Sequence, residues 1–391
     1  MTPAARVSAA ISLLDQILKG APAEKALTVW ARSNRYAGSG DRAAIRDQVY
    51  SALRRLRSAA WAGGAGEAPT GRALMLGLLR QEGEDLSAIF TDARFAPGPL
   101  TDAEQTSPDA APPQVALDYP AWLEADLRAS LGDDFVPVMT TLRDRAPITL
   151  RVNLRKSDPA HAASLLAEEG IVTKPNPRAD SALTVIEGAR RVANSAAYRD
   201  GIVELQDAGS QALAQAVPVA EGARVLDYCA GGGGKTLALA ARAAADFTAH
   251  DAIPARLRDL PERARRAGVT VQLSDAPAAK AFDVVIADVP CSGSGAWRRQ
   301  PQAKWDLTAA RLAELTELQS DILDASARCV APGGVLAYMT CALLDVENDD
   351  QVREFGARHP DWALISTSTS RPDADGDGFF LALLRAPDQT D

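Results

Sequence analysis

The chain has 391 residues, of which 47% are hydrophobic and 24% are charged, so it has a globular composition and enough length for two or three domains. No apolar run approaches the roughly 18 residues that a membrane span requires, and residues 1–20 lack the apolar core of a secretory signal. The four cysteines show no CxxC spacing, which argues against a disulfide framework or a zinc site. We expect a cytoplasmic protein with no membrane anchor and no metal.

The net charge is −9, but it is unevenly distributed. Residues 1–61 hold ten Lys or Arg and four Asp or Glu, whereas residues 62–139 hold four Arg and thirteen acids. This asymmetry is compatible with a basic, nucleic-acid-binding face on an acidic molecule. Ordinary solvated charge on helices remains an equal alternative.

The N-terminal part predicts helices. Apolar residues from Val7 to Leu18 recur at the spacing of one helical face, and Gly20 follows them. A second helix is predicted over residues 41–61 with Asp41 as its cap, and a third over residues 71–80. Residues 96–114 are rich in Pro, Ala and acids, as is typical of a linker. We therefore expect a helical domain over residues 1–95.

Two further modules are expected after the linker. Residues 115–200 predict a small α+β module, with strands at 148–154 and 182–188 and a helix at 161–170. Residues 201–391 alternate between short apolar strands and helices, which predicts a parallel sheet covered on both faces.

A glycine loop opens the second of these modules. The segment VLDYCAGGGGKT runs from Val225 to Thr236, and we expect a strand to end at Asp227 and a helix to begin near Lys235. Glycines permit close backbone approach and a helix N-terminus offers unpaired N–H groups, so an adenosine-bearing cofactor fits here. Cys229 stands where a Walker A loop needs glycine, which disfavours a phosphate-cradling loop. A purely structural turn is the alternative.

Acids and thiols follow the next strands. Asp251 and Asp275 each follow a predicted strand and could bind the ribose and the adenine of such a cofactor. Asp288 precedes a Pro-Cys pair that ends at Cys291, and Thr340 precedes Cys341. The carboxyl ends of parallel strands share one edge, so both thiols should face one crevice. A lone cysteine there is more often a small buried hydrophobe.

These segments carry a family resemblance. DYCAGGGGKT, DVPCSGSGAWRRQPQAKW and MTCALLDVEND resemble, in order and spacing, the motifs of Sun/Fmu (RsmB-type) RNA cytosine-5 methyltransferases. VELQDAGSQ, DGDGFFLALLR and LRVN are similar to further segments of that family, and DRAAIRDQVYSALRR resembles a helical domain like the antitermination factor NusB. The sequence departs from the family at Gly231-Gly232, where Ala-Pro is usual, and at Val289 and Ala342.

The resemblance implies a fold and a reaction. The fold is a Rossmann-like S-adenosylmethionine-dependent methyltransferase domain, preceded by a small α+β module and an all-α N-terminal domain. The reaction forms 5-methylcytosine, most often in small-subunit (16S) ribosomal RNA. Cys341 would add to C6 of the base, Asp288 would contact the ring and the cofactor, and Cys291 would assist product release. The implied cofactor-binding residues are Cys229, Ala230, Gly231, Gly232, Gly233, Gly234, Lys235, Asp251, Asp275 and Asp288.

Six basic residues are candidates for RNA phosphate contacts. Arg42, Arg46 and Arg54 lie in the predicted helical domain, and Arg298, Arg299 and Lys304 follow the Pro-Cys motif. The latter three could instead provide the positive setting that lowers the pKa of the Cys341 thiol. Trp297 and Trp305 could stack on bases or belong to the core.

Other functions remain open from the sequence. The same family includes transfer-RNA methyltransferases, and a catalytically silent RNA-binding assembly factor for the ribosome would carry the same fold. Amino-methyltransferases of related fold carry an N/D-P-P-Y/F motif where this chain has DVPC. The sequence holds no signal for the oligomeric state.

Overall fold

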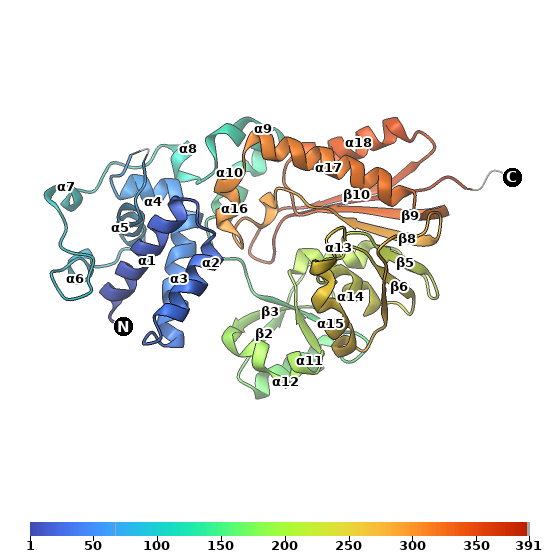
Figure 1. Ribbon diagram of the computed structural model, residues 1–391, viewed down its shortest axis with the longest axis horizontal. Coiled ribbons are helices and arrows are strands. Elements are labelled where there is room, and N and C mark those ends of the chain that lie inside the picture. Colours follow the sequence, from blue (N-terminus) through green and yellow to red (C-terminus); the bar gives the residue numbers. More distant parts are fainter. Residues whose placement is uncertain (67, 389–391) are drawn as a thin grey trace. The chain divides into compact units, whose positions relative to one another are not determined.

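The computed structural model describes residues 1–66 and 68–388 (Figure 1). Its contacts divide it into two compact units. The helical unit comprises Met1–Arg145 together with Trp297–Asp306, and the sheet unit comprises Ala146–Ala296 and the residues from Leu307 onward. The expected boundaries after residues 114 and 200 do not coincide with this division. The segment that follows the Pro-Cys motif belongs with the N-terminal helices.

The helical unit is built from helices of very different lengths. They are α1 (Pro3–Leu18), α2 (Ala23–Ser33), α3 (Ser39–Arg54), α4 (Leu56–Ala62), α5 (Gly71–Gln81), α6 (Leu86–Ile89), α7 (Asp102–Gln105), α8 (Pro113–Ala116), α9 (Glu124–Leu131), α10 (Phe135–Thr141) and α16 (Pro301–Asp306), with 3-10 turns η1 (Ala121–Leu123) and η2 (Gly132–Asp134).

Helix α1 shows why the N-terminal residues fold as they do. The side chain of Thr2 caps the helix by accepting the Ala5 N–H. Val7, Leu14 and Ile17 of the predicted stripe are buried, and they pack in one core with residues of α3 and α5. The predicted helical face is therefore confirmed.

The helix predicted over residues 41–61 is two helices. Arg55, with φ −113°, lies between α3 and α4 and interrupts the helical backbone. Asp41 does support the start of α3, but from inside the first turn. One of its oxygens accepts the Gly38 N–H at 3.2 Å and the other accepts Arg6 Nε at 2.8 Å.

The predicted linker over residues 96–114 contains only short helical turns, but it is anchored to the helical unit. Arg72 Nε donates to Glu104 Oε1 at 2.7 Å, and Arg57 Nη1 donates to the Gln114 carbonyl at 2.8 Å. These contacts hold α7 and α8 against helices that lie far earlier in the chain.

The sheet unit contains two sheets. The smaller is antiparallel with strand order β2-β3-β1-β4. Its strands are β1 (Thr149–Val152), β2 (Val172–Pro175), β3 (Ala182–Glu187) and β4 (Val203–Leu205), and its helices are α11 (Pro159–Glu168) and α12 (Ala196–Arg199), with the 3-10 turn η3 (Ala189–Asn194). The strands and helix predicted for this module are confirmed in type and place.

The larger sheet has seven strands in the order β10-β11-β9-β8-β5-β6-β7. Strands β9, β8, β5, β6 and β7 are parallel, and β11 and β10 add antiparallel strands at one edge. The strands are β5 (Arg224–Asp227), β6 (Asp246–Ala249), β7 (Val271–Leu273), β8 (Phe282–Asp288), β9 (Val330–Thr340), β10 (Ala363–Ser370) and β11 (Phe379–Arg385).

Helices cover both faces of this sheet (Figure 1). They are α13 (Ala208–Ala216), α14 (Gly234–Ala240), α15 (Leu260–Ala267), α17 (Ala309–Ala327) and α18 (Asp349–Arg358), with 3-10 turns η4 (Pro254–Asp259), η5 (Ser294–Ala296) and η6 (Asp345–Glu347). Helices α13 and α14 contribute to the core on one face, and α17 and α18 contribute to the core on the other. This is the Rossmann-like architecture that the sequence predicted. Edge strand β10 was not predicted, because its side chains are exposed on both faces and show no alternation.

Among the residues that the structure describes, no helix is long and apolar enough to span a bilayer.

Candidate functional site

The glycine loop connects β5 to the N-terminus of α14. Gly231 and Gly233 have φ of 50° and 76°, which side chains other than glycine rarely adopt. A Cβ on Gly233 would also collide with Leu260. The Ala that is usual in the family at position 231 would therefore be strained in this loop.

Asp251 shapes this loop from the end of β6. It is buried, one of its carboxylate oxygens accepts the Gly231 N–H at 3.1 Å, and the other accepts the Ile253 N–H at 2.8 Å. Asp275 follows β7, which pairs with β6, but its side chain is exposed. The two acids predicted to bind a cofactor thus follow neighbouring strands, one ordered by backbone contacts and one facing solvent.

Asp227, at the end of β5, was not among the predicted site residues. Its Oδ2 accepts the Thr236 hydroxyl at 2.6 Å, whereas its buried Oδ1 has no hydrogen-bond partner among the described residues. Burial raises the pKa of this carboxyl to about 6. A buried acceptor without a donor is costly unless a ligand supplies one. Its position directly before the glycine loop was the sequence signal that could have indicated it.

Lys235 and Asp288 form the charged centre of the site. Lys235 is the second residue of α14 and is buried, and its Nζ lies 2.5 Å from Asp288 Oδ2 at the end of β8. Burial alone would lower the pKa of this ammonium. The Asp288 carboxylate and the nearby Cys341 sulfur outweigh that effect and raise it. Lys235 therefore stays charged in a buried position.

The two motif cysteines meet beside this pair. Strands β8 and β9 are parallel neighbours, with Asp288 opposite Met339, and the Cys291 and Cys341 sulfur atoms lie 3.4 Å apart. The hydrogen bond to Cys341 and burial together raise the pKa of Cys291 well above its ordinary value. Cys291 therefore keeps its proton and can donate it to a Cys341 thiolate. The predicted convergence of the thiols within one site is what the structure shows.

A buried carboxylate joins the two cysteine segments. Glu347 is fully buried, and its oxygens accept the Ser292 N–H at 2.7 Å and the Ser292 hydroxyl at 2.5 Å. Gln319 of α17 donates both to Glu347 at 3.0 Å and to the Pro290 carbonyl at 3.0 Å. Glu347 thereby holds the residues on either side of Cys291 from the segment that follows Cys341. Sequence analysis missed this role, because an acid six residues after a cysteine carries no distinctive spacing.

Cys229 and Cys329 lie apart from the pair of motif cysteines. Cys229 lies in the glycine loop, where burial raises the pKa of its thiol, and Cys329 is buried behind α17. Among the described residues, no cluster of three or more His, Cys, Asp or Glu side chains could hold a metal ion.

The basic residues predicted to bind RNA divide into two groups. Arg46 and Arg299 are exposed and Arg42 is half-buried. Arg54, Arg298 and Lys304 are buried within the helical unit, which is a correction to their expected role as phosphate contacts. Buried and internally bonded cations cannot reach phosphate oxygens in this structure.

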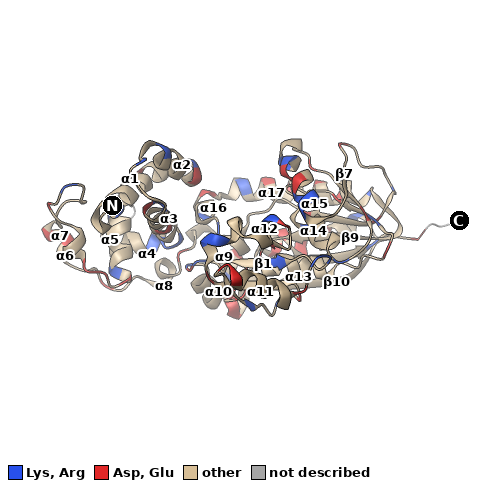
Figure 2. Cartoon of the chain, turned by 90° about the horizontal axis from the view of Figure 1, so that it is seen from below, with Lys and Arg blue, Asp and Glu red and all other residues tan. Residues whose placement is uncertain are grey.

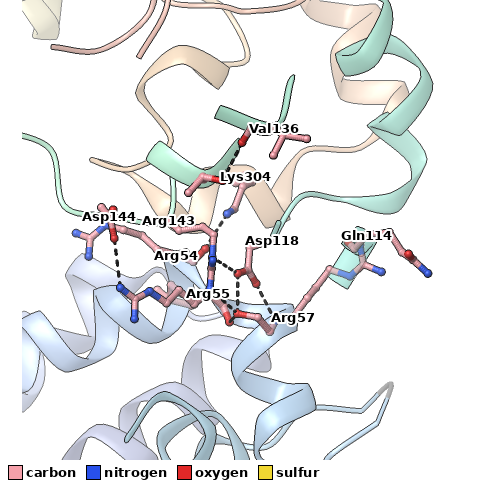
Figure 3. Close-up of polar contacts among 12 residues, drawn as sticks. Arg54, Arg55, Arg57, Gln114, Asp118, Val136, Arg143, Asp144 and Lys304 are labelled. Carbon is pink, nitrogen blue, oxygen red and sulfur yellow. Dashed lines mark hydrogen bonds and ion pairs between the residues drawn. The ribbon is translucent and has the colours of Figure 1, made fainter. Parts of the chain in front are cut away.

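The buried cations bind one another's backbones. Arg54 Nε donates to the Arg298 carbonyl at 2.7 Å. Lys304 Nζ donates to the Arg54 carbonyl at 2.9 Å (Figure 3). Trp305 Nε1 donates to the Leu53 carbonyl at 2.6 Å, and Trp297 is almost fully buried. These residues fix the Trp297–Asp306 segment to the end of α3. Within the sheet unit, Lys235 supplies positive charge near Cys341.

Asp118 supplies the counter-charge in this cluster. It is buried, accepts the Ser58 N–H and hydroxyl at 2.8 and 2.7 Å, and pairs with Arg143 at 2.9 Å (Figure 3). Burial lowers the pKa of Lys304 to about 7, with Arg143 and Arg54 contributing in the same direction against the attraction of Asp118. At neutral pH, the Lys304 amine inside the helical unit is therefore only partly protonated.

Comparisons with known proteins show which family the chain belongs to. Residues 214–389 match the family described as 16S rRNA methyltransferase RsmB/F, and residues 119–193 match the ferredoxin-like domain of RsmF/B-like methyltransferases. The ribosomal RNA small subunit methyltransferase B of Vibrio cholerae is 34% identical over 300 residues, which cover 72% of this chain and 68% of the relative. The chain belongs to the RsmB/F family.

Solved structures share the fold of this RsmB/F chain. The crystal structure of PH0851 has a TM-score of 0.75 at 21% identity and covers 98% of this chain and 99% of its own. NSun6 from Pyrococcus horikoshii, solved with SFG, has a TM-score of 0.60 at 18% identity over 69% of this chain and 99% of its own. The protein is thus an S-adenosylmethionine-dependent RNA methyltransferase of the RsmB/F family.

The first prediction concerns Lys235. Lys235→Met removes the positive charge beside Cys341 that would stabilise a developing negative charge on its sulfur, so alkylation of Cys341 by iodoacetamide at pH 7.5 should slow by about ten-fold. Peptide mass spectrometry would follow Cys341 separately from the other thiols. Lys174→Met removes an exposed lysine of the same unit and should leave the rate unchanged. Equal alkylation rates in all three proteins would contradict the assignment.

The second prediction concerns Glu347. Glu347→Gln replaces a carboxylate that accepts three hydrogen bonds with an amide whose NH₂ group faces donors, so it should cost about 1–3 kcal/mol of stability. Methyl transfer should fall by at least about ten-fold because the Cys291 segment loses its support. Urea unfolding and a methylation assay would measure both. Asp349 is an exposed acid two residues further along the chain, so Asp349→Asn is a matched control. It should change neither the stability nor the rate of methyl transfer.

The third prediction concerns Lys304. The pKa of Lys304 in the folded protein is about 7, below its ordinary value of 10.5. Between pH 7 and pH 10.5 the unfolded chain therefore binds a proton at Lys304 that the folded protein has lost. The free energy of unfolding should therefore rise between pH 7.5 and 9.5, by roughly 1 kcal/mol or more, and it should rise less in Lys304→Met.

Tryptophan fluorescence suits this measurement, because five of the six tryptophans lie in the helical unit. Lys19→Met, at an exposed lysine of that unit, should keep the full pH dependence. A Lys304→Met variant with the same pH dependence as the parent would show that Lys304 is not the titrating group.

Proposed function

We propose that this chain forms 5-methylcytosine in 16S ribosomal RNA, with Cys341 as the nucleophile that adds to C6 of the base. The observation that carries the proposal is the pair of thiols 3.4 Å apart after β8 and β9, beside the ion pair between buried Lys235 and half-buried Asp288. The family match to 16S rRNA methyltransferases supports the choice of RNA. Such a function would place the protein in the cytoplasm.

Cys341 begins the reaction. A thiol is the nucleophile only as a thiolate. The Lys235 ammonium supplies positive charge beside the Cys341 sulfur. The sulfur forms a bond to C6, and the electron pair of the C5–C6 double bond moves to C5, which becomes enamine-like. Negative charge develops at N3 of the ring, where Asp288 makes its contact. A proton that passes from the Lys235 ammonium through Asp288 to N3 neutralises this charge, and it returns when the product is released.

The cofactor residues fit S-adenosylmethionine. The glycine loop brings backbone close to a ligand, Asp251 orders that loop, and the unpartnered Asp227 oxygen can accept a hydrogen bond from a ligand. Cys229, Ala230, Gly231–Gly234, Lys235, Asp275 and Asp288 complete the proposed cofactor-binding set. When bound, S-adenosylmethionine supplies the methyl group that C5 receives.

Cys291 acts at the end of the reaction. Once C5 is methylated, its proton leaves to water and the released electron pair re-forms the C5–C6 double bond. The C6–sulfur bond breaks, and Cys341 departs with its electron pair. Cys291 keeps its proton because its pKa is raised, so it donates a hydrogen bond to the departing sulfur.

The fourth prediction separates the two cysteines. Cys341→Ala should abolish methylation and form no protein–RNA adduct. In Cys291→Ala, Cys341 should still add to C6, but the product should be released slowly. An adduct that survives denaturing electrophoresis should therefore accumulate only in Cys291→Ala. The double variant should behave like Cys341→Ala, because residues that act in sequence are not additive.

The RNA substrate is tested in the same experiment. Labelled methyl groups would be followed into 16S rRNA and into bulk transfer RNA, and bisulfite mapping would locate the modified cytosine. Methylation of transfer RNA alone would replace the proposed substrate with that of the other branch of the family. Normal methylation by both single cysteine variants would rule out covalent catalysis, and no methylation by the parent would leave an RNA-binding assembly factor.

A further inference from the structure

Two exposed aromatic rings converge on one hollow of the helical unit. Tyr36 and Phe95, 73% and 67% exposed, are the most exposed of the large hydrophobic side chains that the structure describes. Both line a cavity of about 610 Å³ whose walls also include Trp30 and helix α1. A single exposed apolar residue needs no explanation, but aromatic rings gathered around one cavity indicate a binding surface.

The two rings are held in place. Phe95 has φ 70°, a backbone conformation that bulky residues rarely adopt, and the guanidinium of Arg94 lies 4.7 Å from the centre of its ring. The Tyr36 hydroxyl donates to Asn34 Oδ1 at 3.0 Å. Strained residues persist where the surroundings impose them, and they concentrate at functional sites. The rings are therefore presented to solvent in defined positions.

A basic hollow lies beside the aromatic one. Its cavity of about 430 Å³ is lined by Thr28, Ala31 and three arginines, Arg32, Arg35 and Arg42, with no acidic side chain. The buried Nε of Arg42 has no hydrogen-bond partner among the described residues. None of the three arginines forms an ion pair within the described part of the chain. These cations therefore lack an anionic partner that the protein itself could supply.

The two hollows adjoin at the turn between α2 and α3. Arg35 lines the basic hollow and the next residue, Tyr36, lines the aromatic one. Consecutive Cα atoms are about 3.8 Å apart, so a ligand that crosses this turn meets both. Figure 2 shows both basic and acidic residues on α2, and acidic residues on α7 at a different place in the same unit.

We propose that these adjoining hollows form one binding site for single-stranded RNA. Tyr36 and Phe95 stack on its bases, and Arg32, Arg35 and Arg42 bind its phosphates. Stacking platforms combined with a basic groove are the means by which proteins hold unpaired strands. A duplex would offer phosphates to the arginines but no open base faces to the rings. The site rests on the proposed RNA methylation, to which it adds a second point of contact outside the sheet unit.

The test is a binding measurement on the full chain. The probes are a fluorescein-labelled 12-nucleotide oligouridylate and a 12-base-pair RNA duplex, followed by anisotropy at two or more salt concentrations. Tyr36→Ala and Phe95→Ala should each weaken oligouridylate binding by about ten-fold without changing its salt dependence. Arg35→Ala should flatten the slope of log affinity against log salt by about 0.7, the value for one lost phosphate contact on a single strand.

Matched controls come from the same unit. Trp122→Ala removes a 40% exposed aromatic ring and Lys19→Ala an exposed cation, and neither residue lines the hollows. Both controls should bind as the parent does. Tyr36→Trp keeps an aromatic face and should retain binding. Circular dichroism would confirm that each variant is folded, as expected for changes at exposed side chains.

Several outcomes would overturn the proposal. Unchanged oligouridylate binding in Tyr36→Ala and Phe95→Ala would remove the stacking role, and an equal loss for the duplex would leave simple charge attraction. Displacement of the RNA probe by a polyglutamate peptide at lower concentration than by unlabelled oligouridylate would indicate a protein partner. If the parent protein does not methylate RNA but its oligouridylate binding still depends on Tyr36, the proposed function is refuted and the proposed RNA-binding site is retained.

Discussion

The sheet unit depends on a buried ammonium group in an unfavourable place. Lys235 lies in the first turn of α14, where the helix dipole disfavours positive charge, and its side chain is almost inaccessible to water. Only a carboxylate in direct contact can offset both effects, and Asp288 provides it at 2.5 Å. Because Asp288 ends β8, the glycine loop, that strand and the cysteine on β9 must be placed together for Lys235 to remain charged. The ion pair thus couples the position of the glycine loop to that of the two thiols.

A second set of contacts keeps the loops after β8 and β9 in register with each other. Glu347 accepts hydrogen bonds from Ser292, and Leu343 donates its N–H to Ser294 Oγ at 2.7 Å. Asn348 accepts from the Thr340 hydroxyl at 2.6 Å and donates to the Ala342 carbonyl at 3.1 Å. Each loop is therefore shaped by side chains of the other or by its own polar residues. The positions of the two sulfur atoms follow from this network rather than from either strand alone.

Local patterns in the sequence predicted the helices, the strands and the glycine loop. Contacts between residues far apart in the chain could not be predicted from it. The α1 stripe, the alternation of strands and helices and the glycine loop were visible, since each is a local pattern. Lys235 and Asp288 could be proposed for the site, but the contact between them spans 53 residues and needs the sheet topology. The fate of Lys304 was unpredictable for the same reason: an exposed and a buried lysine look alike until the segment around it is placed.

The helical unit is made from two separate stretches of the chain, because Trp297–Asp306 belongs to it. A single gene fusion at the N-terminus could therefore neither add nor remove the whole helical unit. A chain that lacked residues 1–145 would leave Trp297 and Lys304 without the neighbours that bury them. The indole ring and the amine would then be exposed to water, in a segment that begins six residues after Cys291. Loss or exchange of the N-terminal residues would demand compensating changes inside the methyltransferase sequence, so the two stretches are expected to be inherited together.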